Sequence, residues 1–338
     1  MVHKMVCGTR KSKRRVIMEQ DYSYLKDKKI LITGGLGFVG VNLVKKLLEM
    51  DVEPTIMDFR PDMSGLDKNY IPFDLDSLPF YNVDLRQSDK AVALVQNISP
   101  DFVIHLAGMT NLERTFEKAE LAIDINLKGT LAILKGSKKA NLNNFVFLST
   151  SDIYGGINPP FRENQLARPV SPYSASKAAA EMFLIMFHNV FEIPVTILRS
   201  FNLYGKYQTP ERIIPFIIKK LLNDEEVPLT KGEQKREFNY IEDLLDAIIR
   251  SLFSKDSQGK ILNIGSGLSI SIKEIAMLIA KKIGKVDNLR IGALQYRENE
   301  IWDMYCDNSL AHDILNWEPK VSLNEGLEKT IEWYRSIR

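Results

Sequence analysis

The chain has 338 residues with 45% hydrophobic and 26% charged side chains, a balance that excludes a disordered or low-complexity protein. Residues 1–15 hold six of the 45 Lys and Arg side chains and no acid, so the rest of the chain is mildly acidic, which argues against a folded nucleic-acid-binding domain. The chain lacks an apolar run of the roughly 20 residues that span a membrane, and its two cysteines, Cys7 and Cys306, cannot form a disulfide framework, so we expect a cytoplasmic protein.

Residues 1–27 are expected to form a basic tail ahead of the folded body. The cluster of positive charge would suit RNA or anionic lipid. A solvated tail, or sequence upstream of a natural start at Met18, is the simpler interpretation. We therefore expect neither a nucleic-acid nor a membrane partner.

From Lys28 onward, short apolar runs alternate with amphipathic stretches, as in βαβ units on a parallel sheet. The expected strands are 29–33, 54–59, 80–85, 102–107, 145–149 and 195–200, and the helical patterns lie near 38–50, 88–98, 113–140 and 174–191. This alternation predicts an α/β fold, a Rossmann-type doubly wound parallel sheet over residues 28–202. Beyond it, helices are expected at 213–222, 242–253, 272–283, 308–315 and 323–335 and a strand at 260–264, which predicts a smaller α+β substrate-binding region over 203–338.

The first expected strand runs into a glycine-rich turn and then into a helix. The residues of this turn that we expect at a dinucleotide are Gly34, Gly37, Phe38, Val39 and Gly40. The glycines permit a tight turn and close approach to a pyrophosphate, at which the first N–H groups of the helix point. Asp58, at the end of the second strand, suits the ribose hydroxyls and favours NAD over NADP, and Arg60 weakens that preference.

Tyr173 and Lys177 lie four residues apart at the start of the helix that follows Pro172. Residues with this spacing share one helix face, and an ammonium beside a phenol lowers the pKa of the phenol, so the tyrosine can act as a base near neutral pH. The segment from Ser149 to Gly155 follows the fifth strand, and open α/β sheets bind ligands at such carboxyl ends. The two segments together predict an active site there.

With these motifs, the chain from Lys28 onward resembles an extended short-chain dehydrogenase/reductase of the NAD-dependent nucleotide-sugar epimerase/dehydratase family. The resemblance implies that Thr150, Tyr173 and Lys177 are catalytic and that NAD is the cofactor. It places Asp84 and Leu85 near the adenine and Leu106 and Ala107 along the cofactor. It also implies a structural role for Asn126.

By the same resemblance, the substrate is a nucleotide-diphosphate sugar. Its expected contacts are Thr150, Asn202, Arg236, Arg297 and Glu300, and arginines suit a diphosphate as a carboxylate suits a ribose diol. The sequence departs from the family at Glu237, where members usually have Asp. The family also forms dimers through the helices near 113–140 and 174–191, so we expect a homodimer, although purely intramolecular packing would explain the same apolar faces.

The shared mechanism implies that Tyr173, assisted by Thr150 and Lys177, removes the proton of a sugar hydroxyl, most often at C4, while hydride passes to NAD. Ser151 and Asp152 occupy positions that discriminate between reactions. Common 4,6-dehydratases carry Asp-Glu there, a second group and the related decarboxylases carry Ser-Glu, and epimerases have small or neutral residues. Asp152 has a carboxylate like that Glu, but its side chain is one methylene shorter. It can therefore be either the acid/base of the elimination or a residue that only forms hydrogen bonds at the end of the strand. The incomplete acid pair favours a 4-epimerase.

Three alternatives stay open beside the 4-epimerase. They are a 4,6-dehydratase, a 4-keto-sugar reductase that consumes NAD(P)H, and a non-catalytic dinucleotide-sensing scaffold, against which the intact Thr150, Tyr173 and Lys177 set argues. The four histidines do not cluster with acids or cysteines at ligand spacing, so we expect no metal site.

Overall fold

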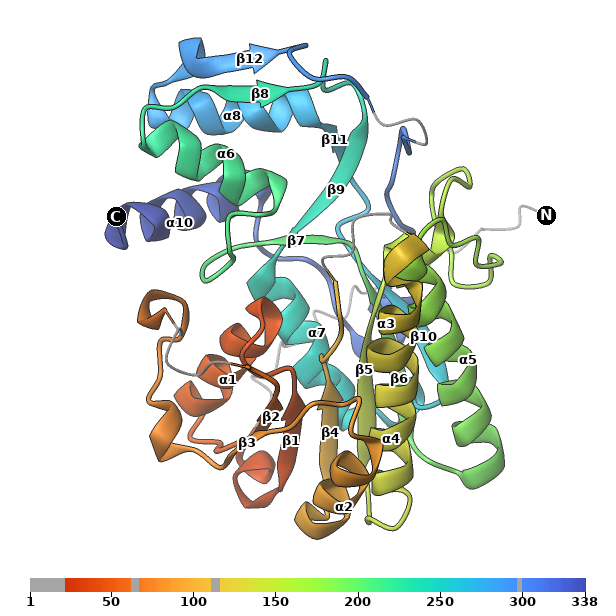
Figure 1. The fold of residues 1–338 in the computed structure, drawn as a ribbon. Coiled ribbons are helices and arrows are strands. Elements are labelled where there is room, and N and C mark those ends of the chain that lie inside the picture. Colours follow the sequence, from red (N-terminus) through yellow and green to blue (C-terminus); the bar gives the residue numbers. More distant parts are fainter. Residues whose placement is uncertain (1–21, 62–66, 111–115, 297–299) are drawn as a thin grey trace, which may run out of the picture.

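The computed structural model describes residues 22–61, 67–110, 116–296 and 300–338. Its main sheet has seven strands in the order β10-β6-β5-β4-β1-β2-β3 (Figure 1). The strands are β1 (Ile30–Thr33), β2 (Thr55–Asp58), β3 (Phe80–Asn82), β4 (Phe102–His105), β5 (Asn144–Thr150), β6 (Val195–Ser200) and β10 (Lys260–Ile264). All six pairings between neighbours are parallel. This order confirms the doubly wound Rossmann-type sheet.

The seventh strand, β10, comes from the segment expected in the carboxyl-terminal region. It pairs in parallel with β6, so that Lys260 lies opposite Thr196. Parallel neighbours need a crossover connection, and helix α7 (Ile241–Phe253) contacts β5 and β6 on the way to β10. The carboxyl-terminal region therefore completes one edge of the main sheet.

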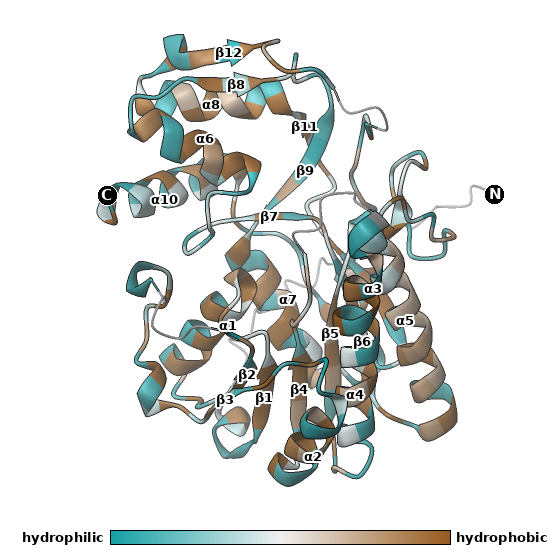
Figure 2. Cartoon of the chain, in the orientation of Figure 1, coloured by the Kyte–Doolittle hydropathy of each residue, from teal (hydrophilic) through white to brown (hydrophobic). Residues whose placement is uncertain are grey.

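Helices cover the sheet on both faces, because successive strand residues point to opposite sides. Ile30 and Ile32 belong to the core with α1 (Phe38–Glu49) and α7, whereas Leu31 lies between them in sequence and belongs to the opposite core. The opposite core includes α2 (Ser88–Ile98), α4 (Gly129–Ser137) and α5 (Pro172–Phe191). Figure 2 shows the central strands as a hydrophobic layer between the helices of the two faces.

The segment expected as one helix over 113–140 is divided in the structure. A 3₁₀ turn (Phe116–Lys118) leads into α3 (Ala119–Ala122), a π-helix (Ile123–Lys128) and then α4, while residues 113–115 lie outside the described residues. The π-helix contains Asn126, whose side chain accepts a hydrogen bond from Met109 N and donates one to Ser176 Oγ, at 2.7 and 2.9 Å. Asn126 thus ties the loop after β4 to α5, in keeping with the expected structural role.

Most of the remaining elements form a second layer above the main sheet in the view of Figure 1, whereas α9 packs against β10 and α7 of the main sheet. β9 pairs in parallel with β7 and antiparallel with β11, and β8 pairs with β12. The bounds are β7 (Asn202–Tyr204), α6 (Ile213–Leu222), β8 (Val227–Leu229), β9 (Lys235–Tyr240), β11 (Ser269–Ser271), α8 (Ile272–Ile283), β12 (Leu289–Ile291), α9 (Ser309–Leu315) and α10 (Leu323–Ser336). The helices agree with the sequence prediction to within one residue, but none of these short strands was expected.

The basic tail lies outside the described residues up to residue 21. The rest of the segment expected as tail packs on the body: Leu25, in a 3₁₀ helix (Ser23–Asp27), is fully buried, and Tyr22 contacts Phe253 at the end of α7. Within the described residues, no helix is both long enough and apolar enough to cross a membrane.

Candidate active site

In the glycine turn after β1, the backbone of this protein allows only glycine at two positions, whether or not a ligand is bound. Gly34 has a φ of +75°, and a Cβ on Gly40 would lie 2.2 Å from the carbonyl oxygen of Gly34. A Cβ on Gly37 would meet only that oxygen, at 3.3 Å, so its other side is open. Gly37 is also the N-cap of α1, whose first turn carries no acid. The open glycine and the N–H groups of this helix end fit a dinucleotide pyrophosphate. Phe38 and Val39 form that first turn.

The residues expected around the adenosine half gather at the adjacent strand ends. Asp58 Oδ2 accepts a hydrogen bond from Leu36 N at 2.7 Å, which holds the carboxylate against the glycine turn. Burial raises the pKa of Asp58, and the nearby Arg60 guanidinium opposes this rise. Leu106 and Ala107 follow β4, and Ala107 N lies 2.6 Å from where a Cβ on Gly34 would stand.

Asp84 and Leu85 follow β3 on the same side of the molecule. The Asp84 carboxylate accepts a hydrogen bond from Arg86 Nε at 2.8 Å, which lowers the pKa of Asp84. Leu85 is buried and lies against Gly129 of α4. The Asp84 carboxylate is therefore held in place by Arg86, and the Leu85 side chain is part of the hydrophobic core.

The expected catalytic residues converge at the end of β5 and the start of α5. Ser171 caps α5 through a capping box with Ser174, and Pro172 occupies the first turn, which places Tyr173 at the helix start. Thr150 ends β5, and its hydroxyl hydrogen-bonds to the Tyr173 phenol. The structure thus brings Thr150, Tyr173 and Asp152 together, since the Asp152 charge acts on the same phenol.

The protein alone does not lower the pKa of Tyr173, contrary to the sequence expectation. Burial and the Asp152 carboxylate raise this pKa, and the Thr150 hydrogen bond and the Arg212 charge only oppose the rise. The Lys177 ammonium instead lies 3.8 Å from the ring centre of Phe147, and burial lowers the pKa of Lys177 to about 7. Desolvation outweighs the attraction between ammonium and phenolate that the four-residue spacing suggested.

A cavity of about 350 Å³ lies between β7, the start of α6 and β9, and it is lined by Asn202, Arg212 and Phe238 among others. Asn202 Nδ2 donates a hydrogen bond to the Glu237 carbonyl oxygen at 3.1 Å, and Arg212 donates one to the Thr110 carbonyl oxygen at the same distance. Because the Arg212 charge also acts on Tyr173, Arg212 links the cavity to the catalytic residues. The sequence analysis did not predict Arg212 as a site residue. The one sequence feature that could have marked it is its position just before the strongly apolar helix α6.

Arg236 and Glu300, expected as separate ligands of a diphosphate and a ribose, form an ion pair with each other. Arg236 also donates a hydrogen bond to the Lys235 carbonyl oxygen at 2.7 Å. Arg297 lies outside the described residues. The structure therefore joins two of the expected substrate residues at one place near the start of β9.

The departure at Glu237 has a structural explanation. Its carboxylate accepts hydrogen bonds from Cys306 N at 2.8 Å and Gly267 N at 3.1 Å, so it joins two loops.

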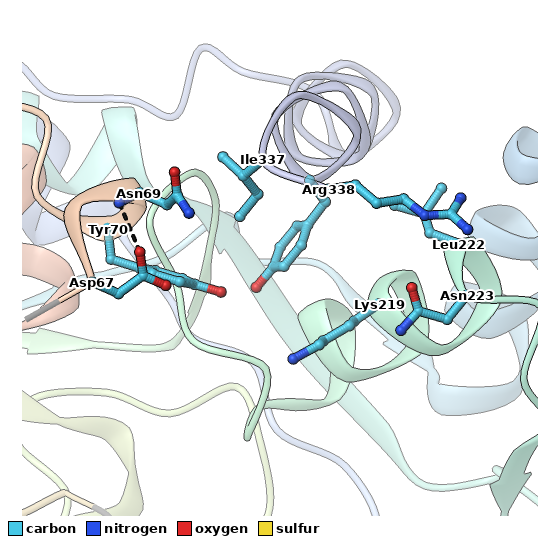
Figure 3. Close-up of a pocket in the computed structure, with 9 residues that line it drawn as sticks. Asp67, Asn69, Tyr70, Lys219, Leu222, Asn223, Ile337 and Arg338 are labelled. Carbon is cyan, nitrogen blue, oxygen red and sulfur yellow. Dashed lines mark hydrogen bonds between the residues drawn. The ribbon is translucent and has the colours of Figure 1, made fainter. Parts of the chain in front are cut away.

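A second cavity, of about 190 Å³ near Tyr70, Lys219 and Tyr334, contains none of the expected site residues (Figure 3). In the part of the chain that the structure describes, no group of three or more His, Cys, Asp or Glu residues could hold a metal ion.

Comparisons with known proteins cover nearly the whole chain. The model of the family described as GDP-mannose 4,6 dehydratase matches residues 31–330. A dTDP-D-glucose 4,6-dehydratase from Bos taurus is 30% identical over 91% of this chain and 89% of its own length. A UDP-glucuronate 4-epimerase from Thermodesulfobacterium geofontis is 30% identical over 90% of this chain and 95% of its own. The solved dTDP-glucose 4,6-dehydratase from Streptomyces venezuelae, with NAD and TDP bound, has a TM-score of 0.82 at 29% identity, covering 91% of this chain and 97% of that chain.

Proposed function

The chain belongs to the extended short-chain dehydrogenase/reductase family of NAD-dependent nucleotide-sugar epimerases and dehydratases, and on that premise we propose that it is a 4-epimerase that transiently oxidises a nucleotide-linked hexose at C4. The observation that carries the choice is the incomplete acid pair at positions 151 and 152. Ser151 is 3% exposed and has no ionisable group, so the site lacks the first acid of the common dehydratase pair. Asp152 has a side chain one methylene shorter than the Glu that both dehydratase groups carry at this position, which favours the epimerase.

The proposed catalytic residues act on the C4 hydroxyl of the sugar. Tyr173 takes its proton, Thr150 hydrogen-bonds to the phenol, and Lys177 holds an ammonium whose pKa of about 7 allows it to exchange a proton near neutral pH. Bound NAD supplies the hydride acceptor, and its oxidised ring supplies positive charge that favours the phenolate. After the ketone has turned over, return of the hydride to the other face of C4, together with return of the proton from Tyr173 to the oxygen, would give the epimer.

We propose that residues 28–202 hold NAD and that most substrate contacts come from 203–338. Gly34, Gly37, Phe38, Val39 and Gly40 cradle the pyrophosphate, and Asp58 binds the ribose. Leu106 and Ala107 line the cofactor, with Asp84 and Leu85 at the adenine end. Asn202 and Arg212, which line the cavity beside β7, bind the nucleotide diphosphate with Arg236 and Arg297, and Glu300 binds the ribose of the nucleotide.

The 4,6-dehydratase is the second candidate, because the Asp152 carboxylate acts on the Tyr173 phenol and could serve as the elimination base. Several relatives also bear dehydratase names. The two functions are separated by incubation with UDP-, GDP-, CDP- and dTDP-hexoses and analysis by mass and NMR. An epimerase gives an isobaric sugar, and the isosteric Asp152→Asn variant keeps at least a tenth of the activity. A dehydratase gives a product lighter by one water, and Asp152→Asn loses it. A requirement for stoichiometric reduced cofactor would instead identify a reductase.

We further propose that the protein is a cytoplasmic homodimer formed through α5 and the π-helix. Met182, Met186 and Val190 of α5 and Ile123 of the π-helix are exposed apolar side chains. The buried free thiol of Cys306 suits a reducing compartment. Light scattering after size-exclusion chromatography should give twice the chain mass, and Met186→Lys should give the monomer. A wild-type monomer would contradict the dimer.

A further inference from the structure

The ammonium of Lys177 lies over the ring of Phe147, 3.8 Å from the ring centre. Lys177 is 4% exposed, and Phe147, on the strand that ends at Thr150, is fully buried. Glu181, whose charge raises the pKa of Lys177, is itself paired with Arg199 at 2.7 Å. The face of the Phe147 ring is therefore a direct contact of the lysine charge, at a place from which most water is excluded.

An aromatic ring face carries negative potential and attracts a cation, most strongly when both groups are removed from water. Burial acts in the opposite direction, because it disfavours the charged lysine and lowers the pKa of Lys177 to about 7. The contact with Phe147 opposes this loss of charge. A ring also differs from a carboxylate, because it attracts the charge without accepting strong hydrogen bonds, so the N–H donors of the ammonium stay available to the reaction.

His105 on β4 stacks with the Phe147 ring and is held in its neutral form. The two ring centres are 5.7 Å apart, with 21° between the planes. Thr130 Oγ1 donates to the Asn126 carbonyl oxygen at 2.6 Å, so it accepts a hydrogen bond from His105 Nε2 at 2.9 Å. His105 Nδ1 then accepts one from the Thr33 hydroxyl at 2.6 Å. Burial and the nearby lysine charge lower the pKa of His105 to about 3, so the imidazole adds no second positive charge beside the ring.

A change confined to the Phe147 ring would leave the charged groups around the lysine in place. Within the described residues, the titratable groups that act on Lys177 or on its neighbours are Glu181, His105, Tyr173, Asp152, Arg199 and Arg212. A shift in the titration of Lys177 after such a change would therefore report the ring contact itself.

We propose that Phe147 is a positioning residue for the C4 chemistry, whose ring face holds the Lys177 ammonium charged and in place one helical turn from Tyr173. The inference rests on the proposed function and deepens it, because it says how the protein holds the lysine that acts there. His105 supports the ring from β4. A ring that only filled space would be insensitive to the electron density of its face, which makes the two roles separable.

The test replaces Phe147 of the full-length protein by mono-, di- and trifluorinated phenylalanine, which nearly keep the shape of the ring and progressively remove negative potential from its face. The activity assay uses a nucleotide-hexose that the wild-type protein turns over. Because the reaction needs the charged lysine, kcat should fall as pH rises past the lysine pKa, and this alkaline midpoint should move down stepwise, by about one pH unit in all. KM should stay within about twofold, because binding of the substrate does not depend on the ring.

Phe145 gives the matched control. It lies on the same strand and in the same core, is fully buried, and has its ring centre 5.9 Å from that of His105, but among the described residues no ammonium lies over its ring. The same fluorinated series at Phe145 should leave the alkaline midpoint unchanged. Phe147→Leu and Phe145→Leu should lose similar stability, and only Phe147→Leu should lower kcat, by about tenfold.

Unfolding of the nucleotide-free protein by denaturant gives a readout that needs no turnover. The free energy of unfolding starts to rise with pH where the folded lysine loses its proton. With trifluorinated phenylalanine in place of Phe147, this rise should begin up to about one pH unit lower than in wild type. With the same replacement of Phe145, it should begin at the wild-type pH.

Two results would overturn the inference. Equal shifts in the Phe147 and Phe145 series would show that fluorination acts through general packing. An unshifted Phe147 series, even where Phe147→Leu is inactive, would show that the ring only fills space. Failure of the wild-type protein to turn over any nucleotide-hexose would instead reject the proposed function, and the unfolding measurement would still decide the ring contact by a shifted or an unshifted onset.

Discussion

Arg199 on β6 and Glu181 on α5 form an ion pair that is buried on both sides, with 2.7 Å between Nη2 and Oε2 and 3.1 Å between Nε and Oε1. Arg199 also donates to the Tyr154 hydroxyl at 2.8 Å, and Tyr154 donates to Asn263 Oδ1 of β10 at 2.7 Å. Glu181 lies one helical turn after Lys177, and its charge raises the pKa of that lysine. The pair therefore ties the helix that carries the proposed catalytic lysine to two strands of the sheet.

Glu181→Gln should lower the free energy of unfolding by about 3–5 kcal/mol, because it leaves the Arg199 charge buried and uncompensated. Urea denaturation measures this loss. The matched control is Asp124→Asn, which breaks an exposed pair with Lys128 and should cost no more than about 0.5 kcal/mol. A loss below about 1 kcal/mol for Glu181→Gln would show that the network does not carry the stability assigned to it.

The stability of the nucleotide-free protein should depend on pH through Lys177. The folded state releases the lysine proton near pH 7, whereas an unfolded lysine keeps it to about 10.5. Between these values the unfolded chain binds more protons, so the free energy of unfolding should rise with pH by up to ~1.4 kcal/mol per unit. Below pH 7 both states hold the proton and the contribution is flat.

Comparison of wild type with Lys177→Met by denaturant titration from pH 6 to 9 isolates this contribution. The difference in slope between the two proteins should appear only above pH 7. Parallel stability curves across this range would contradict the lowered pKa of Lys177.

Gly37→Ala and Gly40→Ala should separate dinucleotide binding from folding. A Cβ on Gly40 would meet backbone atoms of Gly34 and Gly35 at 2.2 and 2.6 Å, so Gly40→Ala should destabilise the chain by about 1–3 kcal/mol or more. A Cβ on Gly37 meets only one atom at 3.3 Å, so Gly37→Ala should fold normally and lose NAD affinity at least tenfold. Unfolding curves and calorimetric titration measure the two effects. Normal NAD binding by Gly37→Ala would place the pyrophosphate elsewhere.

Local patterns predicted most of the sheet and the helices to within a residue, because hydrophobic periodicity records which face of each element is buried. The assignment of 260–264 to the main sheet escaped prediction, since pairing with β6 depends on the path of α7 rather than on the strand residues themselves. The π-helix at Asn126 was missed for a similar reason. Its side-chain bonds join Met109 and Ser176, which are distant in sequence.

The positions of the site residues could be predicted where sequence spacing fixes their geometry. Their pKa values could not, because these depend on how deeply each side chain is buried. Helix and strand ends place Thr150, Tyr173 and Asp58 as expected. The spacing of Tyr173 and Lys177 could not reveal that desolvation raises the pKa of one and lowers that of the other. Arg212 was overlooked because its relation to Tyr173 arises only when the second layer of the fold packs against the sheet.

The most direct test of the proposed C4 chemistry is the fate of deuterium placed at C4 of the nucleotide-hexose that the enzyme accepts. For a 4-epimerase with Tyr173 as base, NMR should find the deuterium at C4 of an isobaric epimer, and Tyr173→Phe should reduce turnover by at least about a hundredfold. Deuterium at C6 of a product that has lost water would identify a dehydratase instead. Loss of the deuterium to solvent, or unchanged turnover in Tyr173→Phe, would contradict the mechanism.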